Sequence, residues 1–279
     1  MKIAVASGKG GTGKTTVALA LAHAAEGGAR LLDCDVEEPN CHLFVRPKRE
    51  EVLPVTLRAP VIDQERCRLC GKCAEACEFS ALAAMPTKVL TFPDLCHGCG
   101  ACSFVCPSGA ITETPIEIGE VRIGSAGDLR LVYGCLHVGK AQAPPVIREV
   151  MRHASRRATT IIDAPPGSSC PMVAATRRAD FILLVTELTP FGLHDLGLAI
   201  DTIEPMGIPM GIVINRVPEG YTDDLALDDR APVLLRIPES RKIAETYARG
   251  GTLLDAMPEM RPQFEELLRL ATAGEASRC

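Results

Sequence analysis

Short apolar runs recur along most of the chain, separated by longer stretches with helical patterns. The runs are residues 2–6, 30–35, 159–163, 181–187, 211–217 and 234–238. Runs that are apolar throughout are typical of parallel strands covered on both faces. The alanine-rich stretch 17–25 has the composition of a buried helix. This alternation predicts an α/β fold, with a mostly parallel sheet and helices on both faces.

One segment breaks the alternation and predicts a second, smaller domain. Residues 59–116 contain eight cysteines, and prolines occur on both flanks, in 54–60 and at Pro115. The sequence therefore predicts a small α+β insert at 59–116. The large α/β domain would then comprise 1–58 and 117–279.

The stretch SGKGGTGKTT at residues 7–16 lies between the first predicted strand and the first helix. It fits G-x-x-x-x-G-K-[ST], the phosphate-binding P-loop, with its fixed positions at Gly8, Gly13, Lys14 and Thr15. The glycines let backbone N–H groups surround phosphate oxygens, and the helix N-terminus adds partial positive charge. Lys14 is expected to reach the β- and γ-phosphates, and Thr15 to ligate Mg²⁺. The other expected nucleotide contacts are Gly10, Gly11, Thr12 and Thr16. A glycine-rich turn that fits by chance is the alternative.

The insert contains two copies of one cysteine pattern, 29 residues apart. Each copy reads C-x2-C-x2-C-x3-C, the signature of bacterial ferredoxins with two [4Fe–4S] clusters, in which the fourth cysteine of each run binds the other cluster. The expected ligand sets are therefore Cys67, Cys70, Cys73 and Cys106 for one cluster, and Cys96, Cys99, Cys102 and Cys77 for the other.

Zinc is the alternative occupant of the insert. Structural zinc sites pair two C-x2-C knuckles across a longer loop, a spacing that these runs do not follow. The insert departs from the ferredoxin pattern at Glu78, because the second run has Pro107 at the equivalent place. His97 lies between two ligands, and we expect it to be solvated or to lie behind the ligands.

Composition narrows the class of protein. The chain has 279 residues, 47% hydrophobic and 23% charged, as in ordinary globular proteins. A net charge of −5 gives no general affinity for nucleic acid, and the apolar runs are too short to cross a membrane. The N-terminus enters a strand at once, without the features of a secretion signal. We therefore expect a cytoplasmic protein whose thirteen cysteines serve metal or redox chemistry.

Lys9 gives the P-loop a second lysine, in the pattern K-G-G-x-G-K-T. This pattern resembles the deviant Walker A motif of the MinD/ParA superfamily of ATPases, which includes the nitrogenase iron protein. The resemblance implies Mg²⁺-dependent ATP hydrolysis in a homodimer, with Lys9 reaching the nucleotide of the partner subunit. A second cation there would offset charge on the transferred phosphoryl group. A solvated loop lysine is the alternative.

Other residues match this superfamily in the same order along the chain. Asp35 lies where switch I begins and is implied to orient the attacking water, with Asn40 further along the same segment. Asp163 looks like the Walker B aspartate, which holds a water on Mg²⁺ and leads into switch II. Asn215 matches the residue that contacts adenine, and Pro238 belongs to the segment that closes over the base.

Five cysteines lie outside the two runs. Cys135 and Cys170 flank the Walker B aspartate with the spacing of the two cysteines that bridge the nitrogenase iron protein dimer through one [4Fe–4S] cluster. Either they bind such a bridging cluster, or Cys135 is a packing residue and Cys170 an ordinary switch II residue. The other three, Cys34, Cys41 and Cys279, belong to no motif; Cys34 is expected to be buried and Cys41 to begin a helix.

The whole chain resembles a MinD/ParA-type ATPase with an inserted two-cluster ferredoxin domain. The resemblance implies a nucleotide switch in metallocluster assembly, or ATP-gated electron transfer to a client metalloprotein. The alternative is a partner-binding scaffold in which ATP controls assembly and the clusters are structural. Plasmid or septum positioning would require DNA or membrane binding, and no basic patch supports it. The stretch 262–273 has the mixed charge of a helix packed on the core rather than of a membrane anchor.

Overall fold

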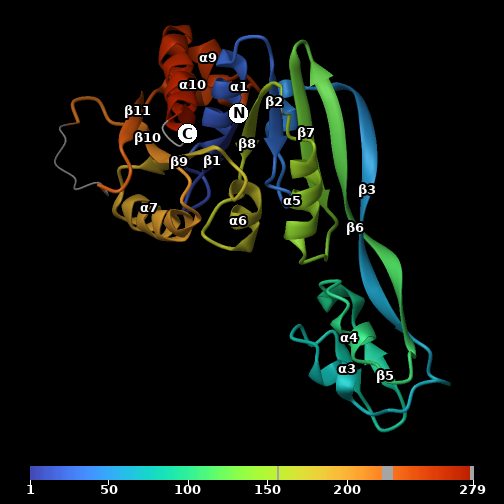
Figure 1. Cartoon of the computed structure of the whole chain (residues 1–279). Coiled ribbons are helices and arrows are strands. Elements are labelled where there is room, and N and C mark those ends of the chain that lie inside the picture. Colours follow the sequence, from blue (N-terminus) through green and yellow to red (C-terminus); the bar gives the residue numbers. More distant parts are fainter. Residues whose placement is uncertain (156, 222–228, 277–279) are drawn as a thin grey trace. The chain divides into compact units, whose positions relative to one another are not determined.

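The computed structural model describes residues 1–155, 157–221 and 229–276, and the chain divides into two compact units (Figure 1). Unit 1 comprises Met1–Val52, Val121–Cys135 and Ile147–Cys279, and unit 2 comprises Leu53–Glu120 and Leu136–Val146. Unit 2 contains the predicted insert, extends it at both ends and adds a second, separate stretch of chain.

Unit 1 is built on a nine-stranded sheet with the strand order β11-β10-β9-β1-β8-β2-β7-β6-β3. The central strand β1 is parallel to both of its neighbours, β8 and β9, and the β2–β8, β2–β7, β9–β10 and β10–β11 pairs are parallel too. The strands are β1 (Lys2–Ala6), β2 (Ala29–Asp33), β3 (Lys48–Ile62), β6 (Ile111–Ala126), β7 (Leu129–Leu136), β8 (Thr159–Asp163), β9 (Phe181–Glu187), β10 (Met210–Val217) and β11 (Val233–Pro238). The predicted α/β fold with a mostly parallel sheet is confirmed.

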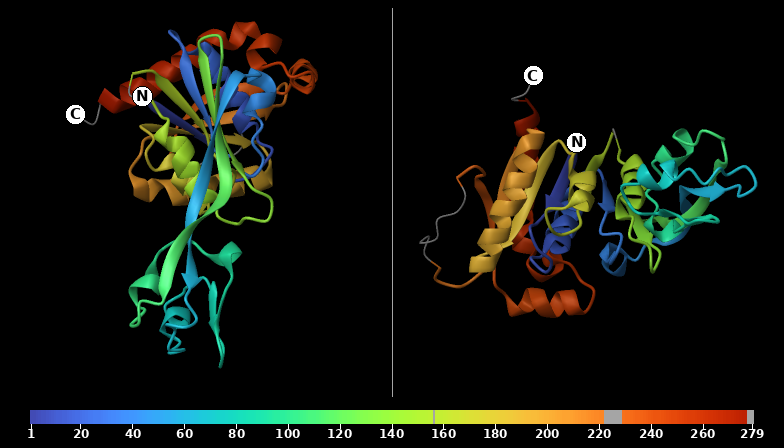
Figure 2. Two further views of the ribbon diagram at one scale, coloured as in Figure 1. Left: turned by 90° about the vertical axis from the view of Figure 1, so that its right-hand side faces the viewer. Right: turned by 90° about the horizontal axis from the view of Figure 1, so that it is seen from below.

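Helices cover both faces of this sheet (Figures 1 and 2). Helices α1 (Lys14–Ala24), α9 (Leu253–Ala256) and α10 (Arg261–Ala276) lie on one face, and α6 (Cys170–Thr176) and α7 (Pro190–Ile203) lie on the other. The remaining helices of this unit are α2 (Cys41–Val45), α8 (Arg241–Ala248), the short 3₁₀ turns η2 (Glu204–Met206) and η3 (Pro258–Met260), and most of α5 (Ala143–Arg152).

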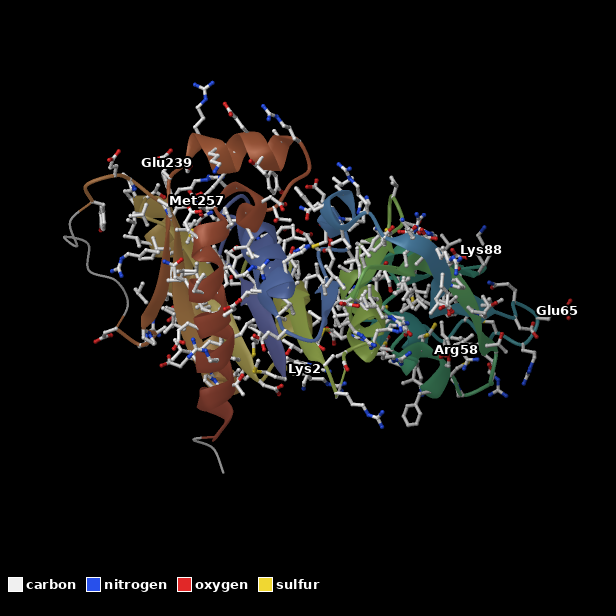
Figure 3. All side chains as sticks on the ribbon, turned by 90° about the horizontal axis from the view of Figure 1, so that it is seen from above. Lys2, Arg58, Glu65, Lys88, Glu239 and Met257 are labelled. Carbon is white, nitrogen blue, oxygen red and sulfur yellow. The ribbon has the colours of Figure 1, made fainter. Side chains whose placement is uncertain are left out.

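The core of unit 1 explains why α1 is apolar on every side. Its residues from Val17 to Ala22 are all buried, between the sheet and α10. Helix α10 contributes Phe264, Leu267 and Ala271 to this core, so the stretch 262–273 packs on the core as predicted. Met257, labelled in Figure 3, packs against the same core from the turn between α9 and η3.

The proline-bearing flanks of the predicted insert belong to strands. Residues 54–60 lie inside the long strand β3, and Pro115 lies inside β6. Strand β3 is the last strand of the sheet, and an edge strand tolerates proline because one row of its N–H groups needs no partner. The second predicted strand is also shorter than 30–35, since β2 ends at Asp33.

Besides parts of the long strands β3 and β6, unit 2 contains short elements. They are α3 (Lys72–Glu75), α4 (Ala101–Phe104), η1 (Pro93–Leu95) and an antiparallel hairpin of β4 (Leu82–Ala84) and β5 (Val89–Thr91). The stretch 136–146 joins it through Asp94, whose carboxylate pairs with Lys140 at 2.5 Å and whose carbonyl accepts from Gln142 Nε2 at 2.6 Å. Cysteines form much of the small core of this unit, together with Leu82, Val89 and Ile111.

Candidate functional site

The P-loop runs from the end of β1 into α1, and close packing shapes it. A Cβ at Gly8 would lie 1.9 Å from the carbonyl oxygen of Asp195 in α7. Gly13 has a left-handed backbone with φ of 95°, and a Cβ there would lie 2.2 Å from Asn215 Nδ2. Both fixed glycines of the motif therefore occupy positions that a side chain could not.

A cavity of about 650 Å³ opens beside the loop, a size in the range of about 300–1,000 Å³ that is usual for small-ligand sites. Its lining includes the P-loop residues Gly10, Gly11, Gly13, Lys14, Thr15 and Thr16, together with Asp35, Asn40, Asn215 and Pro238. The structure thus brings together most of the predicted nucleotide contacts. Gly8 and Thr12 do not line the cavity, because Gly8 packs on α7 and Thr12 is buried.

Helix α8 closes a further side of the cavity and was not predicted. Arg241, Ile243, Ala244 and Tyr247 all line it, and the Tyr247 ring packs against Phe44 of α2 with centroids 4.5 Å apart. The helix follows Pro238 by a few residues. A helix that starts shortly after a proline can be expected from the sequence, but the sequence does not show that this helix would line the cavity.

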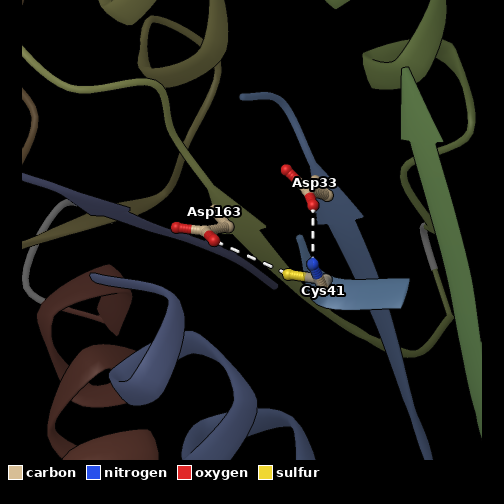
Figure 4. A group of neighbouring side chains, drawn as sticks. All are labelled: Asp33, Cys41 and Asp163. Carbon is tan, nitrogen blue, oxygen red and sulfur yellow. Dashed lines mark hydrogen bonds between the residues drawn. The ribbon is translucent and has the colours of Figure 1, made fainter. Parts of the chain in front are cut away.

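Behind Thr15, side chains from three segments meet (Figure 4). Thr15 Oγ1 donates to Asp163 Oδ2 at 2.7 Å, and the Cys41 thiol donates to the same oxygen at 3.6 Å. Candidate ligand atoms of Asp33, Cys41 and Asp163 lie within 4.8 Å of one another. The sequence indicated only that Cys41 begins a helix, because no local pattern links this cysteine to a carboxylate 122 residues away.

Asp33 organises the segment in which switch I is expected. Its carboxylate accepts backbone N–H bonds from Asp35 at 3.1 Å and from Asn40 and Cys41 at 3.0 Å. These bonds turn the chain away from the sheet and begin α2. They also explain why the second strand ends two residues before its predicted end.

The charge balance of this corner fits a divalent cation. Burial raises the pKa of Asp163, and the neighbouring charge of Asp33 raises it further. Burial and the charge of Asp33 raise the pKa of Asp35 to about 6. Burial lowers the pKa of Lys14, while the charges of Asp163 and Asp35 oppose that shift. Asp163 Oδ1 is buried and has no hydrogen-bond partner among the described residues, and oxygen atoms of this kind suit a hydrated Mg²⁺.

The opposite rim of the cavity includes Asn215 and Arg216 at the end of β10. Asn215 Nδ2 donates to the Thr12 carbonyl at 2.8 Å. The next residue, Arg216, has a left-handed backbone with φ of 55° and donates to Glu187 Oε1 at 2.5 Å. Lys9 does not line the cavity, and its Nζ lies 3.8 Å from Glu187 Oε2.

Unit 2 contains two smaller cavities, each lined by four cysteines. One set is Cys67, Cys70, Cys73 and Cys106, and the other is Cys77, Cys96, Cys99 and Cys102. Each cavity thus groups three cysteines of one run with the fourth cysteine of the other, which is the grouping that the predicted ligand sets require. His97 lines the second cavity, is exposed and stacks on Phe79 with ring centroids 3.7 Å apart.

The two cysteine runs share a backbone as well as a sequence pattern. Positions 29 residues apart have matching left-handed φ values: Leu69 and Gly98 at 51° and 64°, Gly71 and Gly100 at 75° and 76°, and Ser80 and Gly109 at 53° and 59°. Each fourth cysteine sulfur accepts a backbone N–H bond at 3.3 Å, from Ala81 and Ala110 respectively. At Cys106, burial acts to raise the thiol pKa, but the surrounding hydrogen bonds, including that from Ala110, lower it overall, and a lower pKa favours the thiolate form that metals bind.

The remaining cysteines fall in different environments. Cys34 and Cys41 are fully buried. Cys135 is half-buried at the end of β7, and Cys170 is exposed at the start of α6. Cys279 lies outside the described residues.

Comparison with known proteins gives consistent matches over the chain. The model of the CobQ/CobB/MinD/ParA nucleotide binding domain matches residues 3–253. Uncharacterized protein MJ0578 of Methanocaldococcus jannaschii is 36% identical over 220 residues, which cover 77% of this chain and 78% of that protein. Uncharacterized protein MJ0579 of the same organism is 30% identical over 278 residues, 96% of each chain.

Solved structures share the fold at low identity. The septum site-determining protein MinD of Pyrococcus horikoshii, complexed with Mg-ADP, has a TM-score of 0.56 and 18% identity, covering 98% of each chain. The cell division ATPase MinD of Pyrococcus furiosus has a TM-score of 0.55 and 20% identity, covering 96% of this chain and 98% of its own. Within the described residues, no helix has the length and apolar character needed to span a bilayer.

Proposed function

Because the chain belongs to the CobQ/CobB/MinD/ParA nucleotide-binding family, we propose that it hydrolyses ATP with Mg²⁺ as a homodimeric switch. The switch acts in metallocluster assembly, or in ATP-gated electron transfer to a client metalloprotein. The observation that carries the nucleotide part is the cavity that joins the P-loop, switch I and Asn215. Septum placement, named for the structural relatives, is not included, since their identity to this chain is 20% or less.

Within this proposal the chain's residues divide the work of phosphoryl transfer. Lys14 and the loop N–H groups hold the β- and γ-phosphates, and Thr15 would ligate Mg²⁺. Asp163 Oδ1, buried and without a partner in the described part of the chain, would hold a water on that ion. Asp35 lines the cavity and orients the attacking water, and Asn215 and Pro238 contact the base. Lys9 reaches the nucleotide of the partner subunit.

We also propose that unit 2 holds two [4Fe–4S] clusters per subunit. Two cavities with four cysteines each support this, and so do the N–H bonds to Cys77 and Cys106. When bound, such a cluster accepts and releases single electrons. The residues of the chain hold the thiolates in place and cover the ligands with apolar side chains such as Val89 and Ile111.

The spacing of the thiolates favours clusters over zinc. One tetrahedral zinc with Zn–S bonds near 2.3 Å would hold its sulfurs about 3.8 Å apart. Among the described residues, no group of three or more candidate ligand atoms within 4.8 Å of one another includes a cysteine of the insert. Wider separation is what a cluster requires, because each thiolate binds a different iron atom.

Switch I gives the nucleotide a mechanical connection to the rest of unit 1. A γ-phosphate orders the switch segments of P-loop proteins, and hydrolysis releases them. Here the switch I backbone is held by Asp33, and Asp33 lies beside Asp163 at the expected Mg²⁺ position. Loss of the γ-phosphate would therefore act on the three N–H bonds that begin α2.

The variant Asp35→Asn tests the hydrolysis mechanism. It is expected to lower kcat by about a hundredfold or more, because an amide cannot accept a proton from the attacking water. ATP-bound dimers should then accumulate, which sedimentation velocity and phosphate release would measure together. Glu38→Gln, which removes another acidic side chain from the same cavity, is the matched control and should turn over normally. Normal turnover of Asp35→Asn would assign the water to another residue.

The variant pair Cys135→Ser and Cys170→Ser tests whether a bridging cluster exists. If each subunit gives two thiolates to one cluster on the two-fold axis, the anaerobic dimer holds about four irons beyond the sixteen or so of two inserts. The double variant should lose only those four, with the paired signal of the insert unchanged. A wild-type dimer that never exceeds sixteen irons after reconstitution would make both cysteines ordinary packing and surface residues.

A further inference from the structure

The P-loop is held from one side by two neighbouring strand ends. Glu187 ends β9, and Asn215 lies beside it in register on β10. Asn215 reaches the second half of the loop at the Thr12 carbonyl, and Glu187 reaches the first half at Lys9. The lysine that distinguishes this loop is therefore paired within its own subunit.

The Glu187 carboxylate pairs with two cationic side chains at different distances. Oε1 accepts from Arg216 at 2.5 Å, while Oε2 lies 3.8 Å from Lys9 Nζ. The pairing of β10 with β11 is irregular between Ile214 and Val217, and Arg216 takes a left-handed backbone there. Irregularities of this kind re-aim side chains near functional sites. Arg216 is thus the closer, hydrogen-bonded partner of the carboxylate, and Lys9 is the more distant partner.

We propose that Glu187 is a positioning residue for Lys9, which it retains over its own P-loop so that ATP-driven dimerisation must first break this pair. The inference rests on the proposed homodimeric switch. When Lys9 leaves for the partner subunit, Arg216 stays on Oε1, so the largely buried carboxylate is not left without a cation. The cost of release is small for this reason.

The variant Glu187→Gln measures the effect. The dimer dissociation constant is determined by sedimentation velocity with Mg²⁺ and a non-hydrolysable ATP analogue, at saturating analogue for each variant. A partly exposed ion pair contributes little, but formation of one dimer breaks two such pairs, so the dissociation constant is expected to fall about two- to thirtyfold. Arg216→Gln should act in the opposite direction, because it leaves the whole carboxylate to Lys9.

Asp180→Asn is the matched control. Asp180 pairs with Lys2 at 3.4 Å at the other end of β1, with side-chain exposures of 23% and 31%, close to the 14% and 31% of Glu187 and Lys9. The Asp180→Asn substitution changes the net charge by the same amount as Glu187→Gln and should leave the dimer dissociation constant unchanged. A second readout needs no dimer: mass-spectrometric labelling of Lys9 by an amine-reactive ester should be faster in nucleotide-free Glu187→Gln than in wild type.

The outcomes separate this inference from the proposed function. A wild-type protein that stays monomeric with the analogue overturns the homodimeric switch and the inference together. A wild type that dimerises, with Glu187→Gln unchanged or weaker, overturns the inference alone. Unaltered Lys9 labelling, or an equal gain in Asp180→Asn, also overturns it.

Discussion

Replacing Lys14 by alanine is expected to lower affinity for MgATP by about a hundredfold to several thousandfold, since two charge-assisted contacts to phosphate are lost. The structure makes this lysine hard to replace. The residue is 7% exposed and lines the cavity, close to the acidic groups of Asp35 and Asp163. Without the lysine, the phosphates would enter a corner whose fixed side-chain charges are negative. Isothermal titration calorimetry with ADP and ATP measures the loss.

Lys9→Ala is the matched control, because it removes the same charge from the same loop. Lys9 does not line the cavity of its own subunit, so nucleotide affinity of the monomer should be nearly unchanged. ATP-dependent dimerisation and turnover should nevertheless disappear, as expected of a lysine that serves the partner's nucleotide. An unchanged hydrolysis rate in Lys9→Ala would remove the trans role, and tight MgATP binding by Lys14→Ala would remove the P-loop assignment.

Anaerobically purified protein is expected to contain about eight irons per subunit, held in two groups of four. The cavities predict which thiolates act together. Cys77 lines the same cavity as Cys96 and Cys99, although it is nearer in sequence to Cys73. Loss of Cys77 should therefore disturb the Cys96 site and spare the Cys73 site.

Paired single variants make this a sharp comparison. Cys77→Ser and Cys106→Ser carry the same substitution at equivalent places of the repeat, so each is the control for the other. Low-temperature EPR of the reduced protein should show two interacting clusters in wild type and different altered signals in the two variants. Identical signals would refute the exchange of the fourth cysteine. Stoichiometric zinc in protein made with ample iron would refute the clusters altogether.

Local patterns predicted the features that depend on neighbours in sequence. The P-loop is one contiguous stretch between a strand and a helix, and each cysteine run fixes its own turn, as the left-handed pairs Gly71 and Gly100 show. The central strands were found because they are apolar over their whole length. The sequence does not indicate strands β3 and β6, because proline normally marks a break. The place of β3 at the edge of the sheet explains its prolines, but it does not explain Pro115 of β6, which lies between two strands.

Contacts made across the sheet could not be predicted. The Cys41 thiol meets Asp163 over 122 residues of chain. Lys9, just after β1, pairs with Glu187 at the end of β9, the parallel neighbour of β1. Apolar periodicity reports which residues are inside, and it says nothing about which carboxylate faces which cation. The same holds for Tyr247 in α8, whose role depends on where the helix is carried after β11.

The order of the strands sets the order in which a ribosome completes the two units. All of unit 2 has been synthesised once Val146 emerges. The P-loop strand β1 then still lacks both of its neighbours, since β8 begins at Thr159 and β9 at Phe181. Domains generally fold as units as the chain emerges. The cysteine-bearing unit can therefore fold while the nucleotide site does not yet exist. If unit 2 binds clusters as proposed, its first loading with iron would be independent of ATP, and nucleotide control would begin only in the finished chain.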